Sequence, residues 1–526
     1  MSDEFTFKVD RRKFLRRSGL AAIGGGSLVN VIAQLRLMQA AAAESQGGDV
    51  VGDDYKAIVC LFLRGGCDMN NVVVPIGTHP QANYYQDTRA QVAISESAIT
   101  TAGTVISPLS GIKAGDQYGF HPSCQNIAQM FSAGELGVMC NVGTLAEPTT
   151  KANYASVTKP KQLFSHSNQV QEWMSSVADG PFLSGWGGRV ADLMHASENP
   201  DSKASMLITA AGLNDFMVGG AGTVPQYAVT TNGAVTLAGY GSNYASALNA
   251  DGSYKNNVTG KRLKALETII NHANAHLLED GYSSVVRRAR VNEELIGDAL
   301  GVADALQAAS APAQVDFDGN FAAATGGVGN ELKMIARLIA GRKCLGNRRQ
   351  IFFCDLGGFD THQNINGALP NLLTQLDSAI GAFNQTMKDL AAADSDFSYS
   401  DVLGFQASDF NRTFTPNGAP GDLLAGTDHA WGTHAMMFGG AVDGGKFYGD
   451  YPDLTVGAAG TQDTPNNQRG RWIPTTSVDQ YTAVLSSWFG VDRGNGDLDL
   501  ILPNLSRFAD PFEPANNLNF IDPLAI

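Results

Sequence analysis

The chain has 526 residues and a formal net charge of −15, and 44% of its residues are hydrophobic. This length allows one large α/β domain with insertions or several smaller domains, and the hydrophobic fraction supports an ordinary packed core. An acidic surface argues against nucleic acid and anionic membranes as partners. The composition therefore favours a soluble protein with a surface suited to cations.

The N-terminal segment carries the pattern of a twin-arginine export signal. Residues 10–16 read Asp-Arg-Arg-Lys-Phe-Leu-Arg, a glycine-rich apolar stretch covers 19–32, and four alanines at 40–43 suit cleavage. The apolar stretch is too short to span a membrane stably, and no later run resembles a membrane helix. We predict a signal peptide over 1–43, the twin-arginine translocase as a partner during export, and a periplasmic or secreted mature protein.

Four apolar runs predict buried strands of a parallel sheet. They cover 55–63, 136–142, 351–354 and 401–406, and runs of this kind are typical of strands that helices cover on both faces. Amphipathic segments predict helices over 121–133, 169–176, 330–340, 369–393 and 477–489, the last with Ser477 as its N-cap. This pattern predicts an α/β fold, in which ligands bind beyond the carboxyl ends of the strands.

The first predicted strand ends in a glycine turn that carries an aspartate. Asp68 follows Gly65 and Gly66, directly after the 55–63 strand. A metal ligand of an open α/β sheet would lie in this place. An Asp/Asn turn that satisfies its own backbone explains the same residues, so both interpretations stay open at this stretch.

Asp360 and His362 form the central candidate site. They follow the 351–354 strand and the glycine pair at 357–358. A carboxylate and an imidazole aimed at one point suit a divalent metal such as Zn, Mn or Fe. Taken alone, an ordinary strand-end loop explains this stretch better, and the case for a metal depends on the other loops.

Two later loops add further candidate ligands. Asp409 follows the 401–406 strand, with Arg412 three residues on, and the segment 426–434 holds one aspartate and two histidines beside a tryptophan. Three of the nine histidines of the chain lie in these strand-end loops. We therefore predict a shared site for one or two divalent ions, with Zn, Mn, Fe or Ca as candidates. The predicted ligands are Asp68, Asp360, His362, Asp409, Asp428, His429 and His434.

Ser165 and His166 precede the helix predicted over 169–176. The free N–H groups of a helix N-terminus favour an anion and suit a phosphate or sulfate. A serine at this place is more often only an N-cap. A catalytic role for Ser165 and His166, together with Arg412, is the alternative that we carry forward.

The segment of about 190–330 is the least informative. It is rich in small and polar residues over 219–253, and it predicts amphipathic helices over 261–289 and 291–309. His272 and His276 have a spacing that can hold a metal, but no glutamate lies between them in the pattern of a zinc protease, so we interpret them as a surface or packing pair. We predict an insertion or helical layer within one α/β domain over 44–526.

The chain resembles the DUF1501 family, exported bacterial proteins related to the alkaline phosphatase and sulfatase superfamily. The matching stretches are Leu63 to Asp68, Leu163 to Gln169, Gly358 to His362, Ser408 to Thr413, Thr427 to Gly432, Phe447 to Pro452 and Pro474 to Tyr481. The chain departs from the family pattern at Cys67, Asn411 and Ala430, and none of these removes a proposed ligand.

The resemblance implies an alkaline phosphatase-like central sheet flanked by helices, with Asp and His ligands at strand ends. It further implies a divalent metal, a phosphate or sulfate ester as substrate, and a hydroxyl nucleophile at a helix N-terminus. By position that hydroxyl is Ser165, with Thr144 as an alternative. We expect a metal-dependent ester hydrolase, and the competing hypothesis is a non-catalytic exported protein of the same fold with a structural or surface-assembly role.

Overall fold

A computed structural model describes residues 54–109, 115–200, 202, 204–222, 224–234, 239–240, 244–249, 252–270 and 277–525, without the side chains of 270 and 277–291. The predicted signal peptide over 1–43 and the pair His272 and His276 lie outside the described residues. No helix of the described part is long and apolar enough to cross a membrane.

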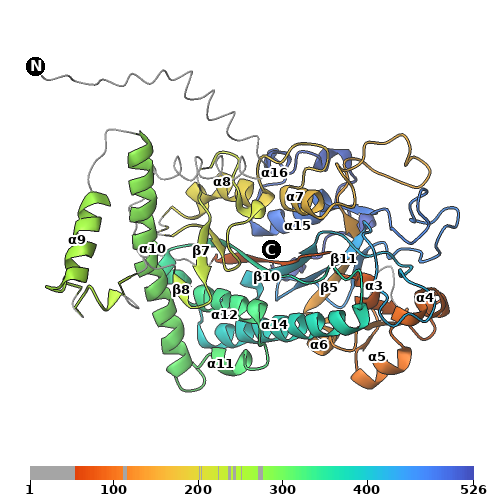
Figure 1. Cartoon of the computed structure of the whole chain (residues 1–526), viewed down its shortest axis with the longest axis horizontal. Coiled ribbons are helices and arrows are strands. Elements are labelled where there is room, and N and C mark those ends of the chain that lie inside the picture. The colour runs from red at the N-terminus through yellow and green to blue at the C-terminus, as the bar shows by residue number, and fades with distance from the viewer. Residues whose placement is uncertain are drawn as a thin grey trace, which may run out of the picture.

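A large mixed sheet, mostly parallel, forms the centre of the molecule (Figure 1). In spatial order its described strands are β12 (Phe447–Gly449), β5 (Leu136–Gly143), β11 (Thr433–Phe438), β10 (Val402–Ser408), β1 (Lys56–Leu63), β9 (Arg349–Leu356), β6 (Leu207–Thr209), β7 (Tyr227–Thr230) and β8 (Gly233–Ala234), with β13 (Thr476–Ser477) beside β5. β1 pairs in parallel with β9 and β10, whereas β11 runs antiparallel to β10 and β5. The α/β fold predicted from the sequence is confirmed at this level.

Helices cover both faces of the sheet (Figure 1). One face carries α6 (Gln125–Ser132), α12 (Gly327–Ala340) and α14 (Ile365–Ala393), and the other carries α7 (His166–Ser175), α8 (Trp186–Glu198) and α15 (Val478–Phe489). Alternate residues of β1 enter two different cores, with Leu61 under the first layer and Phe62 under the second. Burial on both faces is the reason why β1 is apolar without alternation.

The remaining elements extend these layers. A small sheet has the order β2 (Val73–Pro75), β4 (Tyr118–Phe120) and β3 (Val105–Ile106). The other helices are α3 (Met69–Val72), α4 (Ala82–Arg89), α5 (Glu96–Ala102), α9 (Val258–Ile270), α10 (Leu277–Ala308), α11 (Phe317–Asn320), α13 (Arg342–Leu345) and α16 (Asp497–Ile501). Within about 190–330, β6 pairs with β9, so this segment adds strands to the central sheet as well as the helices α9 and α10.

A local sequence signal explains the start of α15. Ser477 begins α15 with a capping box, in which its hydroxyl accepts from the Gln480 amide at 3.1 Å and the Gln480 side chain accepts from the Ser477 amide at 3.0 Å. This reciprocal pair satisfies two amides that a helix start leaves without partners. The predicted N-cap at Ser477 is therefore confirmed.

Candidate metal centre

The loops that carry the predicted ligands meet at one edge of the sheet. The parallel strands β1, β9 and β10 end at Leu63, Leu356 and Ser408. β11 is antiparallel to β10, so the loop that precedes Thr433 comes to the same edge. The strand directions therefore bring the segments after 63, 356 and 408 together with the segment before 433.

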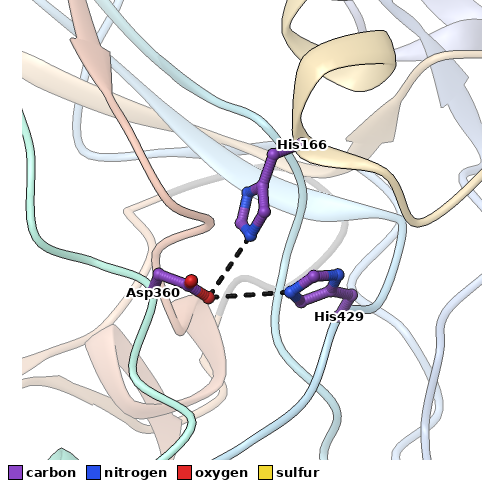
Figure 2. A group of neighbouring side chains, drawn as sticks. All are labelled: His166, Asp360 and His429. Carbon is purple, nitrogen blue, oxygen red and sulfur yellow. Dashed lines mark ion pairs between the residues drawn. The ribbon is translucent and has the colours of Figure 1, made fainter.

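Three side chains form a group that could hold a metal ion (Figure 2). Asp360 Oδ1 lies 3.3 Å from His166 Nε2 and 3.6 Å from His429 Nε2. His166 is the first residue of α7, Asp360 follows β9, and His429 precedes β11. One ligand atom from each of these residues lies within 4.8 Å of the others.

His362 adds a third imidazole to this group. Its Nε2 lies 3.1 Å from Asp360 Oδ1 and 2.9 Å from His429 Nε2. A tetrahedral zinc site with Zn–N and Zn–O bonds of roughly 2.0–2.1 Å places neighbouring ligand atoms about 3.3 Å apart. The distances from Asp360 Oδ1 to the three Nε2 atoms, 3.1–3.6 Å, are close to that spacing, so the group of His166, Asp360 and His429 could hold a small divalent ion, with His362 beside it as a further candidate donor.

The other ring nitrogen of each histidine already has an acceptor. His166 Nδ1 lies 2.7 Å from Asp409 Oδ2, His362 Nδ1 lies 3.1 Å from Asp428 Oδ1, and His429 Nδ1 lies 2.8 Å from the Phe164 carbonyl. Donation from each Nδ1–H leaves the lone pair on Nε2, as in ligated histidines that a carboxylate or carbonyl orients. His166 Nε2 is also buried without a hydrogen-bond partner, and its nearest carboxylate oxygen is Asp360 Oδ1 at 3.3 Å.

Arg412 holds a fixed positive charge beside the group. Its side chain is 0% exposed, and it donates to the carbonyls of Gly65, of Gly66 at 2.9 Å and of Thr427 at 3.2 Å. It also forms an ion pair with Asp360 Oδ1. Partial burial alone would raise the pKa of Asp360, but the hydrogen bond and charge of Arg412 outweigh it and lower that pKa.

The surrounding groups give the histidines different proton affinities. The hydrogen bond that His166 donates to Asp409 raises the pKa of His166, whereas burial lowers the pKa of His429. Burial opposes ionisation of Asp428, but Arg469 outweighs it, and the pKa of this carboxyl falls to about 2. Asp428 therefore stays charged behind His362 across the physiological range.

Two of the predicted ligands lie away from the group. Asp68 is buried and pairs with Arg89 at 2.5 Å, and both side chains are fully covered. His434 is buried on β11, where its Nδ1 accepts from the Asn141 amide at 3.2 Å and its ring stacks on Tyr451. Burial lowers the pKa of His434 to about 3, so its ring stays neutral in the folded protein.

The candidate nucleophiles have partners of their own. Ser165 is the N-cap of α7, but its hydroxyl makes no capping bond and lies 3.3 Å from both Ser167 Oγ and Asn168 Oδ1. The Thr144 hydroxyl is buried and donates to Gln169 Oε1 at 2.7 Å. Neither contact places a hydroxyl of these two residues against Asp360.

The structure also brings in residues that sequence reasoning missed or assigned differently. The sequence suggests a catalytic role for His166, and the structure places it in the group of side chains that could hold a metal ion. Arg469 pairs with Asp428, and the Phe164 carbonyl orients His429. The two arginines within 469–471 of an acidic chain were a sequence signal for the role of Arg469. No sequence pattern predicts which backbone carbonyl will accept a hydrogen bond from a histidine.

An open cleft adjoins the group. It has a volume of about 540 Å³, and its wall includes Arg64, His166, Ser167, Gln171, Asp215 and Asp360. The metal-ligand group is therefore reachable by a small molecule, and α7 forms part of the wall.

Comparison with known proteins gives one informative result. No curated protein is matched by this chain. The family described as "Protein of unknown function (DUF1501)" matches residues 55–467, which hold β1, β9 and β10 and every residue of the His166, Asp360 and His429 group. The chain therefore belongs to the DUF1501 family.

Proposed function

We propose that the protein is an exported metal-dependent hydrolase of phosphate or sulfate esters. One observation carries the proposal: the Nε2 atoms of His166, His362 and His429 lie within 3.6 Å of one carboxylate oxygen of Asp360, beside the fixed guanidinium of Arg412. Such a group at the carboxyl ends of parallel strands, next to an open cleft, is the arrangement expected of a catalytic metal site.

The donor set narrows the choice of ion. Three imidazoles and one carboxylate favour Zn, Mn or Fe, whereas Ca takes six or more oxygen ligands. His166, Asp360 and His429 would hold the ion, with His362 as a further donor. When bound, such an ion acts as a Lewis acid on an ester oxygen and makes water a better nucleophile near neutral pH.

The residues of the chain supply binding and orientation. Arg412 cannot move away from the group, because three backbone carbonyls hold its guanidinium. It would neutralise oxygens of a phosphate or sulfate group that lies against Asp360. The first turn of α7 begins at His166, so its free amides add a partial positive charge for the same anion. Water is the proposed nucleophile, because the Ser165 and Thr144 hydroxyls are engaged elsewhere.

Export is part of the proposal. It is supported by the paired arginines, apolar stretch and alanines within 1–43. An alkaline phosphatase-like ancestry is supported by the strand-end motifs and by the mixed sheet that helices cover on both faces. A periplasmic or secreted location fits an enzyme that releases phosphate or sulfate from esters outside the cytoplasm.

The metal is tested on the purified mature protein. We expect about one equivalent of Zn, Mn or Fe by elemental analysis, and loss of that ion in Asp360→Ala. Asp409→Asn should weaken the affinity about 10–100-fold in competition with a chelator, because it removes the charge that orients His166. His195→Ala is the matched control, since His195 lies on α8 outside the group, and it should keep the ion. Unchanged metal content in Asp360→Ala would contradict the site.

Turnover is tested with aryl phosphate and aryl sulfate. The metal-loaded protein should hydrolyse at least one of them, a chelator should abolish the reaction, and the same metal should restore it. His429→Ala should lose the activity together with the metal. A protein that binds the metal but hydrolyses neither ester would favour the non-catalytic alternative.

A further inference from the structure

The cleft beside the candidate metal centre extends beyond His166 and Asp360 along α7. Ser167 and Gln171 both line it and lie one helical turn apart on α7, which separates them by about 6 Å. The metal-ligand residues His166 and Asp360 line the cleft at the start of this turn, and Arg64 and Asp215 line it as well. The cleft is therefore larger than a phosphate or sulfate group needs.

Arg64 is fixed in this wall with part of its guanidinium free. Its side chain is 40% exposed, and its Nε forms an ion pair with Asp355. Its guanidinium carbon lies 5.7 Å from the ring centre of Phe62 and 6.0 Å from that of Phe353. No further side-chain hydrogen bond or ion pair is found for Arg64 among the described residues, so its two terminal nitrogens remain able to donate.

Asp215 and Gln171 complete a mixed set of donors and acceptors. Arg64, Gln171 and Asp215 line the same cleft. Burial raises the pKa of Asp215, and a hydrogen bond donated by Gln171 and the charge of Arg64 act against that rise. Three carboxyl groups, Asp215, Glu331 and Asp355, interact with Arg64, so this end of the cleft has no excess of positive charge. A second anionic group on the substrate would find no net attraction there.

We propose that Arg64, Gln171 and Asp215 bind the alcohol portion of the ester, and that this portion is polyhydroxylated, as in a sugar or polyol. The proposal rests on the proposed hydrolase function. Hydroxyl groups can accept from the terminal nitrogens of Arg64 and donate to the side-chain oxygens of Gln171 and Asp215. An aromatic alcohol that excludes water would leave the terminal nitrogens of Arg64 without partners, which costs binding energy.

The test compares hexose 6-phosphate with 4-nitrophenyl phosphate, and the corresponding sulfates, on the metal-loaded protein. We expect kcat/KM to favour the sugar ester despite its poorer leaving group. Arg64→Met should raise KM for the sugar ester about tenfold, the loss expected for one hydrogen bond to a charged group, with kcat and the aryl ester little changed. Gln171→Leu should act in the same direction, and it keeps the Arg64–Asp355 ion pair in case Arg64→Met fails to fold.

Arg337→Met is the matched control. Arg337 pairs with Asp304 and lies on α12, which covers the opposite face of the sheet, and its loss should change neither KM. Preference for the aryl ester, or equal losses on both esters in folded Arg64→Met and Gln171→Leu, would overturn the subsite while the hydrolase stands. Turnover of none of the esters would overturn the hydrolase and the subsite together.

Discussion

Gly65 allows two loops of the metal centre to touch. Its φ of +109° is one that side chains rarely adopt, and a Cβ there would lie 2.5 Å from the Asp360 amide nitrogen. Its amide donates to Asp409 Oδ1 at 3.1 Å, and its carbonyl accepts from Arg412. One residue without a side chain therefore joins the β1 end to three residues of the site.

Gly65→Ala should disturb the metal centre more than the fold. The added methyl pushes Asp360 away, so we expect metal affinity to fall at least tenfold, beyond a cost of about 1–2 kcal/mol for the left-handed backbone. Chelator competition and urea unfolding measure the two effects. Gly103→Ala is the control: its φ is +73°, and a Cβ would meet nothing within 4 Å. It should lose stability only, and equal metal loss in both variants would argue against the contact.

At the scale of elements, α7 carries both a candidate metal ligand and a buried acid. His166 is its first residue, and Glu172 lies in its second half, where Gln169 Nε2 donates to Glu172 Oε2 at 2.5 Å. Burial raises the pKa of Glu172 to about 8, against the opposing effect of neighbouring hydrogen bonds such as the one that Gln169 donates. The buried carboxyl group of Glu172 is therefore mostly protonated near neutral pH in the folded protein.

This raised pKa makes stability depend on pH in a defined direction. The folded protein binds the Glu172 proton more tightly than the unfolded chain, so its contribution is complete below about pH 4.5 and is lost as pH rises through about 8. Glu172→Gln should remove this part of the pH dependence. The free energy of unfolding of the variant, relative to that of the wild type, should therefore rise between pH 5 and pH 9. Urea midpoints at several pH values measure the difference.

The exposed Glu513 offers the control for this prediction. Glu513→Gln should leave the difference in stability between pH 5 and pH 9 as it is in the wild type. A Glu172→Gln variant whose profile runs parallel to that of the wild type would show that Glu172 is ionised in the folded protein.

At the scale of the whole molecule, a buried ion pair joins the sheet to the small sheet region and the β10 loop. Asp68 follows β1, and Arg89 is the last residue of α4. Arg89 also donates to the Phe414 carbonyl at 2.9 Å, and its guanidinium lies over the Phe414 ring. Arg89 and Phe414 are 325 residues apart in the chain, so Arg89 links Asp68 after β1 to the segment that follows β10.

Breaking this pair on one side should be costly. Arg89→Met leaves a buried carboxylate without a partner, and we expect a loss of about 3–5 kcal/mol in the free energy of unfolding. The double variant Asp68→Leu with Arg89→Met should recover part of that loss, because neither charge remains. Urea unfolding of the single and double variants gives the coupling between the two residues.

The same residues separate a structural from a metal-binding role for Asp68. Folded Asp68→Asn should keep the metal affinity of the wild type within a few-fold, because Asp68 faces Arg89 and not the His166 group. Loss of the ion in a folded Asp68→Asn protein would place Asp68 back among the ligands.

Much of the fold was predictable because its causes are local. The continuous apolar runs of β1, β5, β9 and β10 reflect burial on both faces, and the capping box of α15 lies within four consecutive residues. The candidate site was predictable in part, since an aspartate or histidine just after a strand, or just before an antiparallel one, lies near the sheet edge. Asp360, His362 and His429 meet for that reason.

By itself the sequence determined an α/β chain with Asp and His at strand ends, because strand periodicity and turn residues act over a few positions. Only the tertiary structure decided which of those side chains meet. It placed His166 with Asp360, paired Asp68 with Arg89, and buried His434 against Tyr451. Each of these contacts forms because packing brings distant segments of the chain together. A local sequence pattern contains no information on which distant side chain will lie nearest.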